Sequence, residues 1–180
     1  MSELALKKEH YTVRDYMTWG EDIKCELIGG IIYDMSPAPR TKHQRISISI
    51  GSRIYMHLIG KDCQAFEAPT DVVLSKDTIV QPDIFIVCDK NKISEDNIKG
   101  APDVIFEIIS PATEFLDRIS KLKLYERYGV KEYFLVNPDE ESIEIYRIAD
   151  GRYGNRIIAN LNETIKIEKI DLKLNLWEIF

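Results

Sequence analysis

Two carboxylates lie in segments that otherwise resemble buried strands. Glu107 is the one acid in the apolar run 104–109, and Asp83 follows Pro82 directly before the apolar run 84–88. An ionised carboxylate in such a place is costly unless it is paired, protonated or bound to a cation. Neighbouring strands lie about 4.8 Å apart, so both acids can be aimed at one point. Oxygen ligands without nearby His or Cys indicate Mg²⁺ or Mn²⁺ rather than zinc.

A positive charge for these acids is expected on the helix that follows the second of the two segments. Asp117, Lys121 and Tyr125 are spaced i, i+4, i+8, so they share one helix face. Lys123 lies about 200° around the helix from Lys121 and points elsewhere. Two interpretations of Lys121 stay open: a surface salt bridge with Asp117, or the charge that balances the strand carboxylate. A plain ion pair between that carboxylate and a helix cation is the alternative to a metal site.

Strand and helix signals along the chain predict an α/β or α+β fold with a mixed sheet. A strand at 103–110, a helix at 113–128 and a strand at 132–136 form one unit, which implies a right-handed parallel crossover. Thr113 is the expected N-cap of that helix, and Gly129 is expected to end it. Two further helices are predicted, one over 13–19 after Thr12 and one over 40–60 with an apolar residue at every fourth position. A hairpin should turn at Gly29 and Gly30. The remaining predicted strands lie at 70–75, at 78–89, at 142–148 with one side exposed, and near 157, 165 and 174.

The residues around the two acids resemble the signature of the PD-(D/E)XK nuclease superfamily. Pro82-Asp83 matches its first part, and Glu107 matches the acid of its second part. The third signature residue is normally Lys, whereas this chain has Ile109. A large bacterial branch of the superfamily, a domain of unknown function grouped with restriction endonucleases, is similar in a further respect. In that branch the lysine stands on the following helix, where this chain has Lys121.

The wider resemblance covers about residues 10–150, through the strings CELIGGIIYDMSPAPRTKHQRI, QPDIFIV and FEIISPATEFLDRISKLKLYERYGVKEYFLVNP. It implies a restriction-endonuclease-like mixed central sheet flanked by helices. It also implies hydrolysis of nucleic-acid phosphodiester bonds, with DNA as the expected substrate and Mg²⁺ or Mn²⁺ as the cofactor. The implied residues are Asp83, Glu107, Lys121 and Glu26 as catalytic groups, and Asp83, Glu107 and the carbonyl of Ile108 as metal ligands. Apart from the resemblance, we expect behind them Asp71, which opens a predicted strand, and Asp117 and Tyr125, which share the helix face of Lys121.

A basic segment is the candidate contact for nucleic acid. Residues 36–61 contain no Asp or Glu and five Lys or Arg residues, in a chain whose formal net charge is -6. Arg40, Lys42, His43 and Arg45 at its leading edge are expected to contact phosphates without reading the base sequence. A solvated helix face is the alternative, and the net negative charge argues against strong indiscriminate binding of nucleic acid.

Length and composition predict one soluble domain. The 180 residues suit a single unit with its core at about 10–150 and C-terminal strands at 151–180. No apolar run reaches the roughly 18 residues that span a bilayer, and no secretory signal is visible. Cys25, Cys63 and Cys88 are scattered and form no C-x-x-C pair, which favours free thiols, a reducing compartment and a cytoplasmic location.

Two other functions compete with the nuclease hypothesis. Ile109 in the lysine position and the net charge favour a catalytically inactive module that keeps the fold and binds nucleic acid or a protein partner. A metal-dependent phosphoesterase for small molecules is the third possibility, although the chain lacks a Gly-rich phosphate loop. The C-terminal segment 172–177 is expected either to cover an open sheet edge or to form a homodimer contact.

Overall fold

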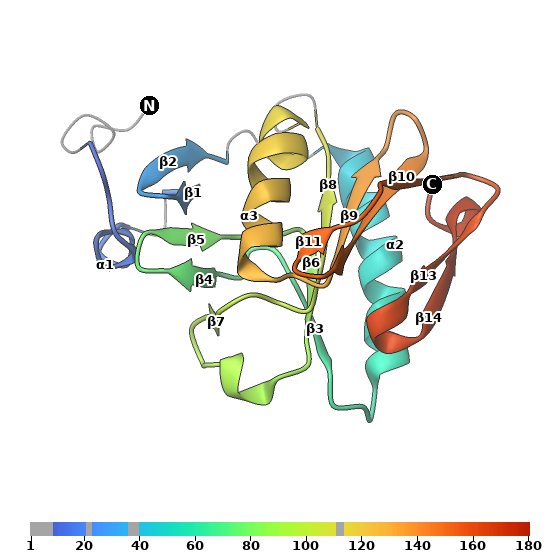
Figure 1. Cartoon of the computed structure of the whole chain (residues 1–180), viewed down its shortest axis with the longest axis horizontal. Coiled ribbons are helices and arrows are strands. Elements are labelled where there is room, and N and C mark those ends of the chain that lie inside the picture. Colours follow the sequence, from blue (N-terminus) through green and yellow to red (C-terminus); the bar gives the residue numbers. More distant parts are fainter. Residues whose placement is uncertain (1–8, 21–22, 36–39, 111–113) are drawn as a thin grey trace.

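The computed structural model of the chain describes residues 9–20, 23–35, 40–110 and 114–180 (Figure 1). Its central sheet has seven strands in the order β11-β10-β9-β8-β6-β3, with β12 paired to β10. β8 and β9 are parallel, as the predicted crossover requires, and the other neighbours are antiparallel. The strands are β3 (Gln64–Glu67), β6 (Ile84–Val87), β8 (Val104–Ile108), β9 (Glu132–Asn137), β10 (Ser142–Ala149), β11 (Arg152–Tyr153) and β12 (Ile157–Asn160).

A smaller sheet of five strands lies beside the central one, in the order β2-β1-β5-β4-β7. Its β1–β2 hairpin turns at Gly29 and Gly30, whose positive φ angles of 56° and 79° suit glycine. The short helix α1 (Val13–Tyr16) has Thr12 as its N-cap, and Thr12 forms a capping box with Asp15. The strands are β1 (Cys25–Ile28), β2 (Ile31–Asp34), β4 (Val72–Ser75), β5 (Thr78–Val80) and β7 (Ile98–Lys99).

The prediction of one strand over 78–89 is wrong. β5 ends at Val80 and belongs to the smaller sheet, whereas β6 begins at Ile84 and belongs to the central sheet. Pro82 lies between them and has no N–H to donate to a strand ladder, so pairing breaks there. The link 81–83 therefore carries the chain from one sheet to the other.

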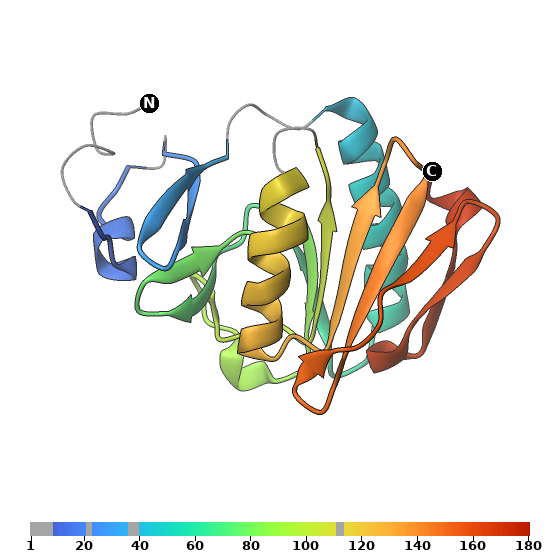
Figure 2. The same ribbon diagram turned by 45° about the horizontal axis from the view of Figure 1, so that its top comes forward.

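Helices cover both faces of the central sheet (Figure 2). α2 (Thr41–Leu58) packs on one face through Ile46, Ile50, Ile54 and Leu58, which are buried as their spacing predicts. The other face carries η3 (Leu116–Lys121), a π-helix that continues as α3 (Leu122–Tyr128) and ends at Gly129 with φ 80°. The predicted cap Thr113 lies outside the described residues. No helix in the described part of the chain has the length and apolar character needed to cross a membrane.

The C-terminal strands form a separate two-stranded pair against α2. β13 (Thr164–Ile167) pairs with β14 (Leu172–Asn175). These two strands confirm the short strands predicted near 165 and 174. The segment 172–177 packs on α2 through its buried leucines, and Ser49 Oγ donates a hydrogen bond to the Glu178 carbonyl at 3.0 Å. Three 3₁₀ turns complete the described elements: η2 (Lys90–Lys92), η4 (Glu168–Ile170) and η5 (Leu176–Glu178).

The prediction that the cysteines are free thiols is wrong for two of the three. Cys63 and Cys88 form a disulfide, while Cys25 is free and buried. Cys63 directly precedes β3, and Cys88 directly follows β6. Because Gln64 lies opposite Val87 in the register of these strands, the two cysteines face each other at the next position. The two cysteines are 25 residues apart in the sequence, and only the pairing of β3 with β6 brings them together. Because two of the three cysteines form a disulfide, the cysteines no longer support a reducing compartment.

Candidate active site

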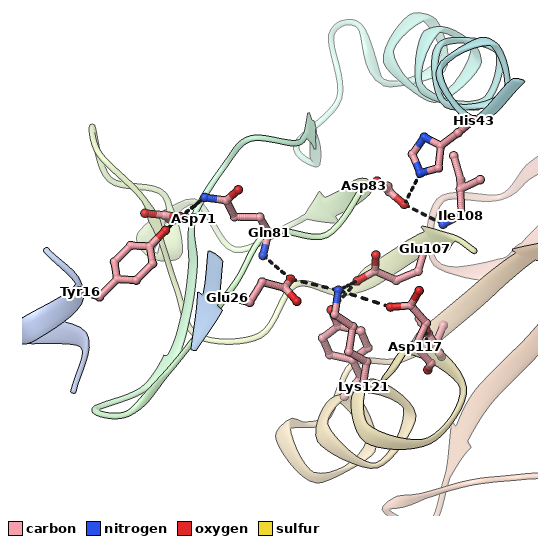
Figure 3. A network of polar contacts seen from close by, with 12 residues as sticks. Tyr16, Glu26, His43, Asp71, Gln81, Asp83, Glu107, Ile108, Asp117 and Lys121 are labelled. Carbon is pink, nitrogen blue, oxygen red and sulfur yellow. Dashed lines mark hydrogen bonds and ion pairs between the residues drawn. The ribbon is translucent and has the colours of Figure 1, made fainter. Parts of the chain in front are cut away.

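Four separate elements bring the predicted catalytic side chains to a single pocket (Figure 3), which Asp34 and Asp117 also line. Glu26 comes from β1, Asp83 from the link between the two sheets, Glu107 from β8 and Lys121 from the end of η3. All four line a pocket of about 110 Å³. It lies where the smaller sheet meets the central one, because the link 81–83 joins the two sheets at that point.

Lys121 is the centre of the polar network. Its Nζ lies 3.0 Å from Glu26 Oε1, 3.0 Å from Glu107 Oε1 and 3.5 Å from Asp117 Oδ1. Each of these side chains is at most 6% exposed. Tyr125 donates a hydrogen bond to Glu107 Oε1 at 2.7 Å. The predicted face with Asp117, Lys121 and Tyr125 thus points inward, although its first half is π-helical. Such π segments are frequent at functional sites.

The electrostatics of the pocket are dominated by its carboxylates. Burial alone would lower the pKa of Lys121, but Glu107, Glu26 and Asp117 outweigh it and hold that pKa well above its ordinary value. The side chain is therefore an ammonium at neutral pH. Burial raises the pKa of Glu107 well above its usual range; Lys121 opposes this, while Asp117, Asp83 and Glu26 add to it. The pocket therefore gathers more carboxyl groups than its one ammonium can pair with.

Asp83 is held on the other side of the pocket. Its Oδ2 accepts a hydrogen bond from the Ile108 N–H at 2.7 Å and lies 3.3 Å from His43 Nε2. The His43 side chain is only 12% exposed, so it belongs to the pocket wall rather than to a basic surface. Burial lowers the pKa of His43, but the hydrogen bond and charge of Asp83 raise it overall. Asp83 is therefore fixed in position from two directions.

Glu26 is oriented by Gln81, which the sequence patterns do not assign to the site. The backbone N–H of Gln81 donates to Glu26 Oε1 at 2.9 Å. The Gln81 side chain donates to Asp71 Oδ1 at 2.7 Å and to the Tyr16 hydroxyl at 3.2 Å, and Tyr16 in turn donates to Asp71 at 3.0 Å. Asp71 therefore lies behind the pocket (Figure 3). The one available signal was the position of Gln81, directly before the Pro-Asp pair.

The predicted nucleic-acid contacts lie around the start of α2, but several of their charges are used within the chain. Arg40 is exposed just before the helix. Lys42 donates a hydrogen bond to the carbonyl of Pro138, and Arg45 donates one to the backbone oxygen of Phe180. Two of the four predicted contacts are thus hydrogen-bonded to other segments of the chain, and both keep their positive charge.

The donor chemistry of the pocket fits a hard divalent cation. In the described residues, no three acid, His or Cys side chains form a ready ligand cage. Lys121 occupies the point between Glu26, Glu107 and Asp117. Asp83 and Glu107 nevertheless line one pocket together with Ile108, and the pocket gathers more carboxyl groups than cationic side chains. Mg²⁺ commonly uses one or two carboxylates and completes its shell with water and phosphate oxygens. Asp83 and Glu107 could therefore hold such an ion.

Comparisons with known proteins identify a matching family model, a related sequence and a solved structure of similar fold. A family model described as Uma2, putative restriction endonuclease, matches residues 13–176. The uncharacterized protein slr1290 of Synechocystis sp. is 27% identical over 158 residues, which span 86% of this chain and 82% of that protein. A crystal structure of a putative nuclease belonging to DUF820 from Anabaena variabilis superposes with a TM-score of 0.79 at 20% identity, covering 94% of this chain and 97% of that one. The fold is therefore restriction-endonuclease-like.

Proposed function

Because the chain belongs to the Uma2 family of putative restriction endonucleases, we propose that it is a metal-dependent endonuclease that hydrolyses phosphodiester bonds in nucleic acid. The observation that carries the proposal is the convergence of Glu26, Asp83, Glu107 and Lys121 on one pocket. Strongly perturbed ionisable groups gathered in a pocket are typical of catalytic sites. The description of the family as restriction endonucleases favours DNA as the substrate.

The residues of the pocket divide the chemistry between them. Asp83 and Glu107 would bind Mg²⁺ or Mn²⁺, which would supply Lewis-acid activation of water and neutralise charge on the phosphate. Lys121, kept cationic by its acidic neighbours, would stabilise the negative charge that develops on the phosphate oxygens. Glu26 and Tyr125 hold the ammonium and the Glu107 carboxylate in place. His43 and the Ile108 amide orient Asp83.

The approach of nucleic acid is proposed from the side of α2. Arg40 is exposed at the start of this helix, three residues before His43, which lines the pocket. A phosphate backbone held near Arg40 would bring a neighbouring phosphodiester toward Asp83. Contacts of this kind position the substrate without reading its base sequence.

The direct test is cleavage of DNA and RNA by the purified chain with Mg²⁺, with Mn²⁺ and with a chelator. We expect metal-dependent cleavage that Asp83→Asn and Glu107→Gln abolish. Glu95→Gln is the control, because Glu95 is an exposed carboxylate outside the pocket. A second measurement is independent of activity: the metal should raise the melting temperature of the wild type but not of Asp83→Asn. Absence of cleavage on every substrate would contradict the proposal.

An inactive, nucleic-acid- or protein-binding module is the second candidate, and one observation favours it. Lys121 compensates Glu26 and Glu107 directly, at 3.0 Å each, so part of the network is satisfied by the chain itself. Such a module should show no metal-dependent stabilisation. In addition, Glu107→Gln should leave its melting temperature unchanged or raised, because it removes a buried carboxylate while Glu26 and Asp117 still compensate Lys121.

A further inference from the structure

The outer strand of the central sheet has an open side. β3 pairs with β6 on one side, and no strand among the described residues pairs with it on the other. The Ala68 N–H donates to the Asp83 carbonyl at 3.1 Å, so in this register Phe66 and Gln64 also bond to β6. Ala65 and Glu67 alternate with them, and therefore direct their N–H and C=O groups toward the open side, where the Glu67 carbonyl already accepts a hydrogen bond from Thr70 Oγ1 at 2.7 Å.

The helix beside this edge has an apolar outward face. Ile48, Tyr55, Met56 and Ile59 of the α2 region are 66%, 62%, 66% and 60% exposed. They lie on the side of α2 opposite its buried residues, where a surface helix normally carries polar side chains. A groove of about 290 Å³ runs between this face and β3, and Phe66 contributes to its wall. A contiguous apolar surface of this kind marks an interaction site.

The positive charges of α2 do not lie in this groove. Arg53 pairs with Glu178 at 3.4 Å, and Arg45 donates to the backbone of Phe180 in the C-terminal segment. The groove walls carry one charged side chain, Glu67. β3 contains neither Lys nor Pro, and Glu67 is the one charged residue of this four-residue strand. The surface therefore combines outward-facing backbone groups with apolar side chains and a single carboxylate.

We propose that this surface binds a second copy of the chain, with β3 pairing antiparallel to β3 of the second copy across a two-fold axis. The backbone selects the register. Only Ala65 and Glu67 have groups facing outward, so a symmetric pairing that uses both sets Ala65 opposite Glu67 of the second copy, and Phe66 opposite Phe66 at the axis. Like charges never face each other in this register, and the two Phe66 rings become neighbours.

The same symmetry matches the helices. The two-fold axis of an antiparallel strand pair stands perpendicular to the joined sheet, so both α2 helices lie on one face of it. Their apolar faces, each with Ile48 and Tyr55, then flank the axis and cover one another. Backbone pairing and side-chain burial thus use one symmetry operation. This inference does not depend on the proposed nuclease activity.

The test is the mass of the full chain in solution, by light scattering or sedimentation over a concentration series. We expect twice the 20.8 kDa of one chain. Ile48→Glu should raise the dissociation constant about 100-fold or more, because it replaces an apolar contact by a second carboxylate in the groove that Glu67 already lines. Ile157→Glu is the matched control, since Ile157 is 51% exposed on β12, and it should leave the mass unchanged. Circular dichroism verifies that both variants fold.

Hydrogen exchange distinguishes this dimer from any other. The N–H groups of Ala65 and Glu67 should exchange slowly in the wild type and rapidly in Ile48→Glu. A single-chain mass at every concentration overturns the proposal, and that outcome is also the one expected if the groove binds a strand of another protein. A dimer that survives Ile48→Glu, or one in which the two amides exchange rapidly, overturns it as well.

Discussion

Removal of the Lys121 ammonium is the sharpest test of the polar network. Its Nζ lies 3.0 Å from two carboxylates and 3.5 Å from a third, and its side chain is 6% exposed. Loss of one partner from a buried ion pair costs about 3–5 kcal/mol, against a total stability of about 5–15 kcal/mol for a domain. Lys121→Met should therefore lower the urea midpoint strongly at neutral pH without changing the m-value. It should also abolish cleavage.

Two control variants test whether Lys121 balances the buried acids. Lys123→Met removes a lysine from the same helix, but Lys123 is exposed, so its urea midpoint should stay close to that of the wild type. The double variant Lys121→Met/Glu107→Gln should recover part of the lost stability, because the uncompensated carboxylate goes with the ammonium. Equal losses for the two single lysine variants, or no recovery in the double variant, would show that Lys121 does not balance buried acids.

Two further predictions concern residues outside the pocket. Cys63→Ser with Cys88→Ser should lower the free energy of unfolding by about 3.5 kcal/mol, the loop-closure value for a separation of 25 residues; equal stability of the oxidised and reduced wild type would contradict this. Burial raises the pKa of Asp103, but Lys131, the Cys88 N–H and Lys169 lower it overall. A depressed pKa stabilises the fold above the unfolded value of about 3.9 and loses that effect in acid. The stability difference between wild type and Asp103→Asn should therefore disappear as the pH falls below about 4, and a difference that persists there would refute the assignment.

Local periodicity singles out two of the side chains that gather in the pocket. Strand alternation isolates Glu107 as an acid in an apolar run, and the spacing of Asp117, Lys121 and Tyr125 assigns Lys121 rather than Lys123 to the inner face. Both are properties of short segments, and the structure has them even though η3 is a π-helix. The buried stripe of α2 follows from the same kind of pattern.

Contacts between distant segments lie beyond such patterns. Nothing near Cys63 indicates that β3 will pair with β6 and bring Cys88 opposite it. The alternation of 142–148 predicts a half-exposed strand, yet Glu144 is buried. Its carboxylate is compensated by Arg118 and by Arg156, which come from other elements. The periodicity of a strand cannot reveal partners that only the assembled sheet supplies.

The short link 81–83 is hydrogen-bonded to both sheets. Its Gln81 amide holds Glu26 of the smaller sheet, while Asp83 is held by the Ile108 amide of the central sheet. Any sliding of one sheet against the other must therefore change the distance between these two acids. A ligand that engages both would brace the junction, so occupancy of the pocket should stiffen the molecule as a whole.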